Sequence, residues 1–339
     1  MDINQRIFLA ATGNSLARAE YRNNHWIVTN PLKETWINRM VANSTNHQIV
    51  YAATQHKGIL RSQDAGLTWT SIGMAHLPVK SIAIDPASPR TIYAGCKPVS
   101  LFVSYDGGGS WEELEAMRKR KQFWWFSPAD PPGVTPYVSG LAVSPEDPDV
   151  LLAGIEVGAL MRSEDGGRTW TKHLRGGQRD CHSLKFHPFS GQWAYEGGGG
   201  GVSFSQDGGR TWRKSKDGLG SKYGWMVAPD PGQPDLWYLS ASEMPKLLRG
   251  EFDPPAHQDG KANAHIYRKA GDEPWVQLSG GLPEPLDDMA YDLATIPENP
   301  GYLFAGLANG DVWYTGDYGD VWEKLPFSLG GIHTSMIVI

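Results

Sequence analysis

The 339-residue sequence lacks several features that define common protein classes. It has two cysteines, Cys96 and Cys181, which lie far apart without metal-site spacing; this argues against a disulfide scaffold and suits a reducing compartment. No apolar run approaches the roughly 20 residues that a membrane-spanning helix needs, so we expect no membrane span. No basic start followed by a long apolar run is visible, so we expect a cytoplasmic protein, although a removed leader would leave no trace.

Positive charge is also scarce, since 31 Lys and Arg face 37 Asp and Glu, a net charge of −6. A nucleic-acid binder needs a basic face to neutralise phosphates, so we expect no nucleic-acid partner. No segment shows a helical period over ten or more residues. Glycine (40), proline (24) and tryptophan (14) are abundant, which predicts short strands joined by turns.

One eight-residue phrase, which we call the box, recurs as "SQDAGLTW", "SYDGGGSW", "SEDGGRTW", "SQDGGRTW" and "TGDYGDVW". The boxes close at Trp69, Trp111, Trp170, Trp212 and Trp322, and two degenerate units close at Trp26 and Trp275. Successive tryptophans are 43, 42, 59, 42, 63 and 47 residues apart. A period near 42 residues with insertions is typical of four-stranded propeller blades.

Each unit shows the pattern strand A, turn, strand B, loop, strand C, box, strand D. The chain begins at a B-like strand, "RIFLAAT", and ends in an A-like strand at 333–339. We therefore predict an all-β fold: one domain over residues 1–339, a seven-bladed β-propeller closed by the last strand pairing into the first blade. Insertions at 112–136 and 241–265 should lie on the face opposite the boxes.

The box itself is interpreted as structural. Its Asp accepts hydrogen bonds within a tight turn, its Gly permits a positive φ, and its Trp fills the space between sheets. A repeated catalytic or metal role is the weaker alternative. The box carboxylates are Asp64, Asp106, Asp165, Asp207 and Asp317.

The pattern Ser-x-Asp-x-Gly-x-Thr-Trp resembles the Asp-box, or bacterial neuraminidase repeat (BNR). Over its whole length the chain resembles BNR-like and WD40/YVTN-like propellers, which include sialidases, xyloglucan-active glycoside hydrolases, sortilin-type receptors and photosystem II assembly factors. "QRIFLA" at 5–10 lacks the Pro of the sialidase Phe/Tyr-Arg-Ile-Pro motif, which argues against a classical sialidase. "RDCHSLKFHP", "YEGGGGG" and "WEKLPFSLGGIH" also resemble bacterial BNR-like proteins often labelled glycosyl hydrolases without a demonstrated activity.

The starts of the A strands and the B–C loops should converge opposite the boxes, at the usual ligand site of a propeller. The catalytic candidates there are Asp180, His182, Glu156 and Asp292. The ligand-binding candidates are Arg39, Lys97, Trp124, Trp125, Glu196, Tyr223, Trp225, Tyr291 and His333.

His182 has two interpretations. With Asp180 two residues away it could act as a general base, or with His333 it could hold a divalent metal, although no cofactor is evident. Alternatively, it hydrogen-bonds to a backbone neighbour at the rim of the core. Paired carboxylates would be required for glycoside hydrolysis.

The segment "MRKRKQFWWFSP" (117–128) joins four basic residues to four aromatics. It could pack onto the propeller, cover the ligand, or contact a protein partner. The five glycines of "YEGGGGGVSF" (195–204) allow a close backbone approach to a ligand or to a neighbouring loop.

The leading functional hypothesis is a soluble enzyme that binds a polar, sugar-like ligand in its funnel. Its chemistry would be hydrolysis or elimination by His and carboxylate acid–base groups. The alternative is a non-catalytic scaffold or assembly factor that binds a protein through the same face.

Overall fold

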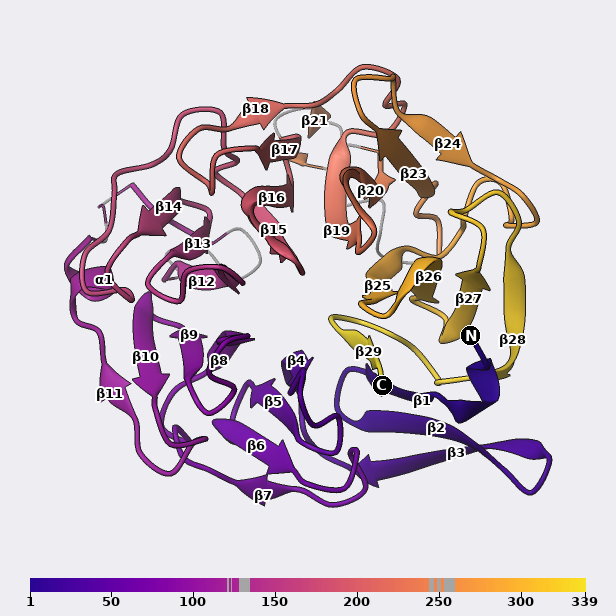
Figure 1. Cartoon of the computed structure of the whole chain (residues 1–339), viewed down its shortest axis with the longest axis horizontal. Coiled ribbons are helices and arrows are strands. Elements are labelled where there is room, and N and C mark those ends of the chain that lie inside the picture. The colour runs from indigo at the N-terminus through magenta and orange to yellow at the C-terminus, as the bar shows by residue number, and fades with distance from the viewer. Residues whose placement is uncertain (121, 123, 128–134, 244–246, 249–250, 253–259) are drawn as a thin grey trace.

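The computed structural model describes residues 1–120, 122, 124–127, 135–243, 247–248, 251–252 and 260–339. They form seven antiparallel blade sheets, arranged in a ring around a common axis (Figure 1), and one separate two-stranded sheet. The predicted seven-bladed β-propeller is confirmed. The described helices are two short ones, the 3-10 helix η1 (Ile3–Gln5) and α1 (Ala116–Arg120).

The strands of each blade follow from the axis outward. Blade 1 contains β29 (Met336–Val338), β1 (Ile7–Ala11), β2 (Leu16–Arg22) and β3 (His25–Leu32). Blade 2 contains β4 (Ile37–Ala42), β5 (Val50–Thr54), β6 (Ile59–Ser62) and β7 (Thr70–Ser71). Blade 3 contains β8 (Val79–Ile84), β9 (Ile92–Cys96), β10 (Ser100–Ser104) and β11 (Glu112–Glu113).

The remaining blades repeat this order. Blade 4 contains β12 (Tyr137–Val143), β13 (Leu151–Glu156) and β14 (Leu160–Ser163). Blade 5 contains β15 (Cys181–His187), β16 (Ser190–Gly198), β17 (Gly201–Ser205) and β18 (Arg213–Lys214). Blade 6 contains β19 (Tyr223–Asp230), β20 (Gln233–Ser242), β23 (His265–Ala270) and β24 (Val276–Leu278). Blade 7 contains β25 (Ala290–Ile296), β26 (Asn299–Leu307), β27 (Asp311–Thr315) and β28 (Glu323–Ser328).

Strand β29 closes the ring, as the terminal sequence pattern predicts. It pairs antiparallel with β1 in the register Phe8↔Val338, Leu9↔Ile337 and Ala10↔Met336. Both chain ends therefore meet in blade 1 (Figure 1). This pairing covers the inner edge of β1, which would otherwise expose unpaired N–H and C=O groups.

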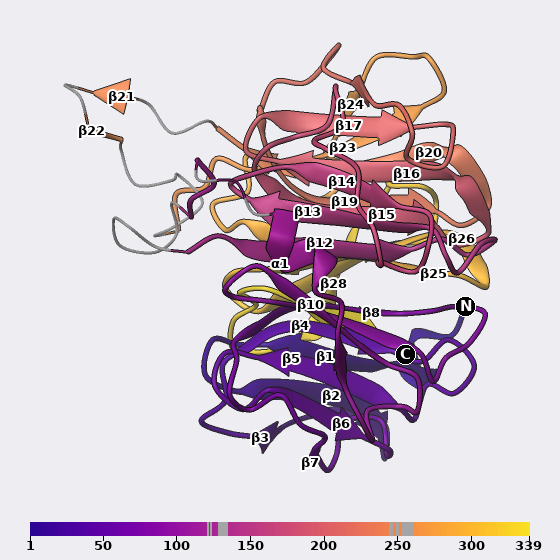
Figure 2. The same cartoon turned by 90° about the vertical axis from the view of Figure 1, so that its left-hand side faces the viewer.

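The antiparallel order gives the ring two different ends. The box end carries the A–B turns and the boxes, because strands A and C both run toward it. A hydrogen bond joins the two in blade 5, where the N–H of Gly208 in the box donates to Gln192 O, near the A–B turn, at 2.8 Å. The mouth end carries the D–A and B–C loops. Figure 2 shows β21 (Leu247–Leu248) and β22 (Glu251–Phe252), from the 241–265 insertion, projecting on the side of the mouth end.

Six A strands share one irregularity at the mouth end. Each carries a β-bulge near its start, where the register against strand B shifts by one residue. In blade 6, Trp225 and Met226 together oppose one residue of strand B. The extra residues of blades 2 to 7 are Asn38, Lys80, Ser139, His182, Trp225 and Tyr291. A bulge turns a side chain away from the regular alternation of the strand, so it places these residues at the mouth.

Glycines on strand B make room for the bulges. Gly95 pairs with Ser81, the residue after the bulge in blade 3, and Gly154 pairs with Gly140 in blade 4. A Cβ on Gly95 would lie 2.3 Å from the Ser81 Oγ, and one on Gly154 would lie 2.3 Å from the Cys181 Sγ. These contacts explain why β9 and β13 carry a glycine at this position.

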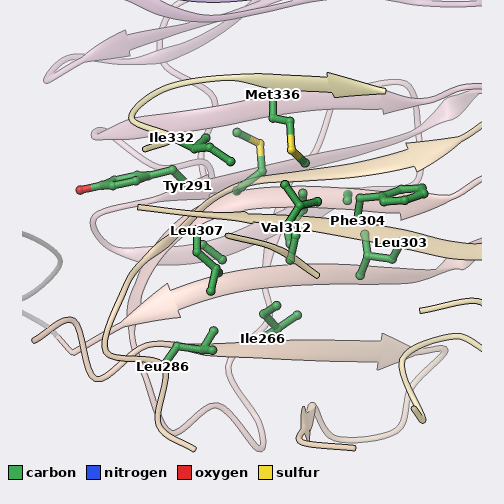
Figure 3. Packing of buried hydrophobic residues seen from close by; sticks show 14 of the residues in the cluster. Ile266, Leu286, Tyr291, Leu303, Phe304, Leu307, Val312, Ile332 and Met336 are labelled. Atoms are coloured by element: carbon green, nitrogen blue, oxygen red, sulfur yellow. The ribbon is translucent and has the colours of Figure 1, made fainter. Parts of the chain in front are cut away.

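The core lies between neighbouring blades rather than in one central mass. Trp212 is 5% exposed and packs with Leu152 and Leu160 of blade 4 and Phe186 of blade 5. The largest cluster joins blades 6, 7 and 1, and Figure 3 shows Tyr291 at one end of it with the hydroxyl pointing away. Burial of each such large apolar side chain contributes roughly 1.5–3 kcal/mol.

Each box forms the tight turn that its sequence predicts. The Oδ1 of Asp207 accepts the Ser205 hydroxyl and the Thr211 N–H, both at 2.8 Å, and its Oδ2 accepts the Thr211 hydroxyl at 2.6 Å. These donors lower the pKa of the Asp207 carboxyl, although burial alone would raise it. The same pattern of a hydroxyl two residues before and an N–H four residues after recurs at Asp64, Asp106, Asp165 and Asp317.

Candidate functional site at the mouth of the ring

The mouth collects side chains from blades that are far apart in sequence. Three of the four predicted catalytic residues, Glu156, Asp180 and His182, lie there close enough for their charges to act on one another. Glu156 ends β13, whereas Asp180 and His182 flank the start of β15. The bulge in β15 is what turns His182 toward this group.

Glu156 is held by a tyrosine from the neighbouring strand. The Tyr137 hydroxyl donates to Glu156 Oε2 at 2.5 Å, and the two residues pair across β12 and β13. Burial raises the pKa of Glu156, and the Asp180 charge adds to this rise, while His182, Tyr137 and Lys80 oppose it. A carboxyl with a raised pKa keeps its proton at higher pH and can act as a general acid.

His182 is oriented from both ring nitrogens. Its Nδ1 lies 2.8 Å from Gly224 O, and a carbonyl can only accept, so Nδ1 carries a proton. Its Nε2 lies 3.4 Å from Asp180 Oδ1 and 3.5 Å from the Tyr223 hydroxyl. Burial alone would lower the pKa of His182, but Asp180 and then Glu156 raise it above its ordinary value. Nε2 is therefore the nitrogen that exchanges a proton with its surroundings.

His182 makes the backbone contact of one interpretation and the Asp180 contact that the other requires. Its acid–base role stays a prediction. The backbone bond fixes the tautomer and the ring plane. The Asp180 contact leaves Nε2 on the side that faces the acidic group. This is the arrangement of a base oriented by neighbouring groups.

Two lysines extend the ionisable group. Lys80, a bulge residue, donates to Gln55 Oε1 at 2.7 Å and lies 5.1 Å from the Tyr137 ring centroid. Burial and the charge of Lys97 lower its pKa to about 8, against the charge of Glu156. Lys97, a predicted ligand-binding residue, therefore belongs electrostatically to this group.

The other part of the mouth is aromatic. The ring centroids of His182 and Trp225 are 4.6 Å apart, those of Trp225 and Tyr291 are 5.2 Å apart, and those of Tyr291 and His333 are 6.4 Å apart. Tyr223 joins the arc, with its ring centroid 5.0 Å from that of His182. Four predicted ligand-binding residues thus form a continuous aromatic arc, and it meets the ionisable group at His182.

Arg39 lies deeper along the axis than predicted. Its guanidinium reaches from blade 2 across the axis to two backbone carbonyls. Nη1 donates to Thr334 O at 2.8 Å, and Nη2 donates to His182 O at 2.9 Å. These two acceptors belong to the first and fifth blades. Arg39 is therefore held by backbone carbonyls below the mouth and is not displayed at its surface.

Asp292 also departs from the prediction. It follows the bulge residue Tyr291, so it lies on the axial side, where its Oδ2 accepts the Met336 N–H at 2.7 Å. Burial raises the pKa of Asp292, and the charges of Lys185 and Arg39 oppose that rise. Asp292 thus belongs with Arg39 and Lys185, apart from Glu156, Asp180 and His182.

Two further candidates are buried inside the fold, which corrects their predicted role as ligand contacts. Trp125 is 6% exposed and packs in the core of blades 3 and 4. Glu196 is fully buried in blade 5, where its Oε2 accepts the Gln178 N–H at 2.7 Å. Burial raises the pKa of Glu196 to about 8. Its carboxyl anchors the loop that precedes Asp180.

The described part of 117–128 packs onto the propeller at some positions and is exposed at others. Met117 and Trp125 are buried, and the Phe126 N–H donates to Val157 O at 3.2 Å. Trp124 is 41% exposed, and the Arg179 guanidinium lies 4.7 Å from its ring centroid. Residues 121, 123 and 128 of this segment, with 129–134 of the 112–136 insertion, lie outside the described residues. So do 244–246, 249–250 and 253–259 of the 241–265 insertion.

Sequence reasoning missed Tyr137 because it placed the start of that A strand at residue 139. Counted from the bulges, Tyr137 occupies the same position as Asp180 and Tyr223, two residues before the extra residue. An alignment of the A strands on that position could have found it. The position therefore supplies three polar groups to the mouth.

Within the described ranges, no three His, Cys, Asp or Glu side chains group as ligands of a metal ion. Trp225 and Tyr291 lie between His182 and His333, the two predicted metal candidates. None of the helices in the described part is long and apolar enough to span a membrane.

The fold is similar to propellers of several functional classes. No protein-family model matches the chain, and no curated protein matches it. It is similar to an ancestral GH74 enzyme (17% identity, TM-score 0.65, 95% of this chain) but spans only 39% of that enzyme. It is also similar to YCF48 bound to a D1 peptide (14% identity, TM-score 0.58, 100% of this chain, 97% of that one). The RRP9 WD40 repeats match at 14% identity and TM-score 0.61, over 96% and 88% of the two chains. At these identities the similarity is one of fold alone.

Proposed function

We propose that the mouth end binds a polar, sugar-like ligand and that Glu156, Asp180 and His182 cleave it by hydrolysis or by an elimination reaction. The observation that carries the proposal is the junction at His182, where the ionisable group meets the aromatic arc. Aromatic faces stack on the apolar faces of sugar rings, while carboxyl and imidazole groups exchange protons with glycosidic or hydroxyl oxygens. The Asp-box resemblance and the GH74 fold neighbour are consistent with this class of ligand.

The roles follow from the contacts. Trp225 and Tyr223 would bind the sugar ring beside His182. Glu156, kept protonated by its burial, would donate a proton to the leaving oxygen. The Asp180–His182 pair would accept a proton from water or from the substrate through Nε2.

The test combines binding with turnover. Neutral β-glucan and xyloglucan oligosaccharides are titrated into the protein by calorimetry, and product release is followed by chromatography. Trp225→Ala should weaken binding about tenfold or more, since stacking on an aromatic contributes roughly 1–3 kcal/mol. Glu156→Gln should retain binding and lose about 10²–10⁴-fold in turnover.

The pH dependence gives a second check. Because the pKa of Glu156 is raised, activity that needs its proton should persist above the ordinary range of a glutamic acid and fall as pH rises through that pKa. The Gln variant should show no such limb. Unchanged binding by Trp225→Ala, together with unchanged turnover by Glu156→Gln, would refute the proposal.

A protein-binding scaffold is the second candidate. Large aromatics are exposed in the D–A loops of the mouth end: Trp36 is 47%, Trp124 41% and Phe126 53% exposed. Exposed aromatics are frequent anchors of protein contacts. A double variant Trp36→Ala/Phe126→Ala should abolish capture of a peptide partner and leave oligosaccharide binding unchanged.

A further inference from the structure

A cavity lies on the other side of Arg39 from the mouth. Its volume is about 470 Å³, and its walls run along the A strands to Pro86, Pro145, Pro188 and Pro297 in the A–B turns. It therefore opens toward the box end. Ligand pockets in proteins usually span roughly 300–1,000 Å³, so this one is large enough for a small molecule.

The walls of the cavity are small and apolar in the layer next to Arg39. Two residues after Arg39 and its equivalents, each A strand again presents a side chain to the axis. These residues line the cavity, and one of them is a cation: Val41, Ala83, Ala142, Lys185 and Ala294. Further toward the turns, Ile84, Val143 and Ile296 continue the apolar lining.

The charges at the inner end of the cavity do not cancel. Arg39 and Lys185 are the two cationic side chains there, and Asp292 is the one acidic side chain; burial lowers the pKa of Lys185 and raises that of Asp292. Asp292 Oδ2 already accepts the Met336 N–H at 2.7 Å. Among the residues that the structure describes, the Lys185 ammonium has one hydrogen-bond acceptor, Leu293 O at 3.3 Å, although an ammonium can donate three bonds.

We propose that this cavity is a separate binding site for a small organic carboxylate with an apolar body. The carboxylate would bind beside Lys185 and Arg39, and the apolar body would lie among the alanine and isoleucine side chains toward the box end. At about 30 Å³ per molecule of liquid water, the volume accommodates on the order of ten to fifteen non-hydrogen atoms. An eight-carbon fatty acid fits this description.

The proposal differs from the function proposed for the mouth in place and in chemistry. The mouth joins aromatic rings to acid–base groups, whereas the cavity joins aliphatic walls to the cationic side chains of Arg39 and Lys185 at its inner end. Arg39 separates the two, because its guanidinium is bonded to the Thr334 and His182 carbonyls. Either site could therefore exist without the other.

The test uses three probes of one chain length: octanoate, octan-1-ol and octylammonium, titrated by calorimetry into the intact protein. Octanoate should bind about tenfold or more tightly than octan-1-ol, because a charge-assisted hydrogen bond stabilises a complex more than a neutral one by an amount that corresponds to about tenfold in affinity. Octylammonium should not bind. Lys185→Met should reduce octanoate affinity to that of octan-1-ol. Ala294→Phe, which fills the cavity while keeping Lys185 and Arg39, should abolish binding of both.

The matched control is Trp225→Ala at the mouth, which should leave octanoate binding unchanged. If Lys185→Met does not fold, a crystal soaked in 8-bromo-octanoate decides, with the bromine expected between Ala294 and Ile296. Equal affinity for octanoate and octan-1-ol in the unaltered protein would overturn the proposal. So would octanoate binding that survives Ala294→Phe or is lost in Trp225→Ala.

Discussion

The two ends of the ring shift the pKa of carboxyl groups in opposite directions. At the box end, hydroxyl and backbone N–H donors surround each carboxylate and lower its pKa, as at Asp207. At the mouth end, burial raises the pKa of Glu156 and Glu196. A carboxyl stabilised in its ionised form fixes a turn, whereas one that retains its proton can exchange it. Whether a carboxyl group has a structural or a chemical role is therefore indicated by its surroundings. Its occurrence in a repeated sequence motif does not indicate this.

The largest expected effect that separates the two ends comes from two tryptophans. Trp212 at the box end is 5% exposed between two blades, so Trp212→Ala should lower the free energy of unfolding by about 3–5 kcal/mol. Trp225 is partly exposed at the mouth, so Trp225→Ala should cost only about 1–2 kcal/mol while it weakens ligand binding. Urea unfolding of both variants measures the difference. Equal costs would mean that the mouth is as much a part of the core as the box end.

An intermediate effect should come from the buried Glu196. Its folded pKa of about 8 exceeds its unfolded value near 4.5, so the native state holds an extra proton between these pH values. Stability should therefore fall by several kcal/mol as pH rises from about 4.5 to 8. Glu196→Gln should remove this slope in urea unfolding measured from pH 4.5 to 8.5. A slope that persists in the Gln variant would assign it to another group.

The smallest expected effect concerns the box carboxylates, with the opposite sign. Asp207→Ala should lower the free energy of unfolding by about 1–2 kcal/mol at neutral pH, because it removes three hydrogen bonds from a partly exposed turn. Since the pKa of Asp207 is lowered, its contribution is lost as pH falls through that pKa, and the variant and the unaltered protein should converge in acid.

Asp180→Asn at the mouth is the matched control for Asp207→Ala. It should change stability little but lower the pKa of His182, because the carboxylate is the main group that raises it. An NMR titration of the histidine resonances measures that shift, with a His182→Gln variant to assign the signal. A box variant that alters this titration, or loses mouth activity while fully folded, would contradict the division between the ends.

Most of the fold could be predicted because its determinants are local and repeated. The box tryptophans gave the blade length, and even the worn units at Trp26 and Trp275 correspond to blades 1 and 6. The closing strand followed from the lack of an A strand before "RIFLAAT". Blade 4 is the exception, because it has no regular D strand. The segment in that place bonds to β14 through the N–H groups of Thr171 and Leu174.

The site could be predicted only in part, since it depends on offsets of one residue. Asp292 and Tyr291 are neighbours in sequence, yet the bulge places Tyr291 at the mouth and Asp292 along the axis. Sequence periodicity does not reveal such a bulge, because the pattern of apolar residues resumes beyond it. The burial of Trp125 and Glu196 depends on contacts between blades, which no local pattern specifies.

The bulges have a consequence for how this molecule can change. Each extra residue shares its partner on strand B with a neighbour, so the register of the blade does not depend on which side chain it carries. Lys80, His182 and Tyr291 occupy equivalent positions with unrelated chemistry. Blades 2 to 7 thus each carry one such position at the mouth, and substitutions there could change the ligand preference without altering the pairing of strands A and B.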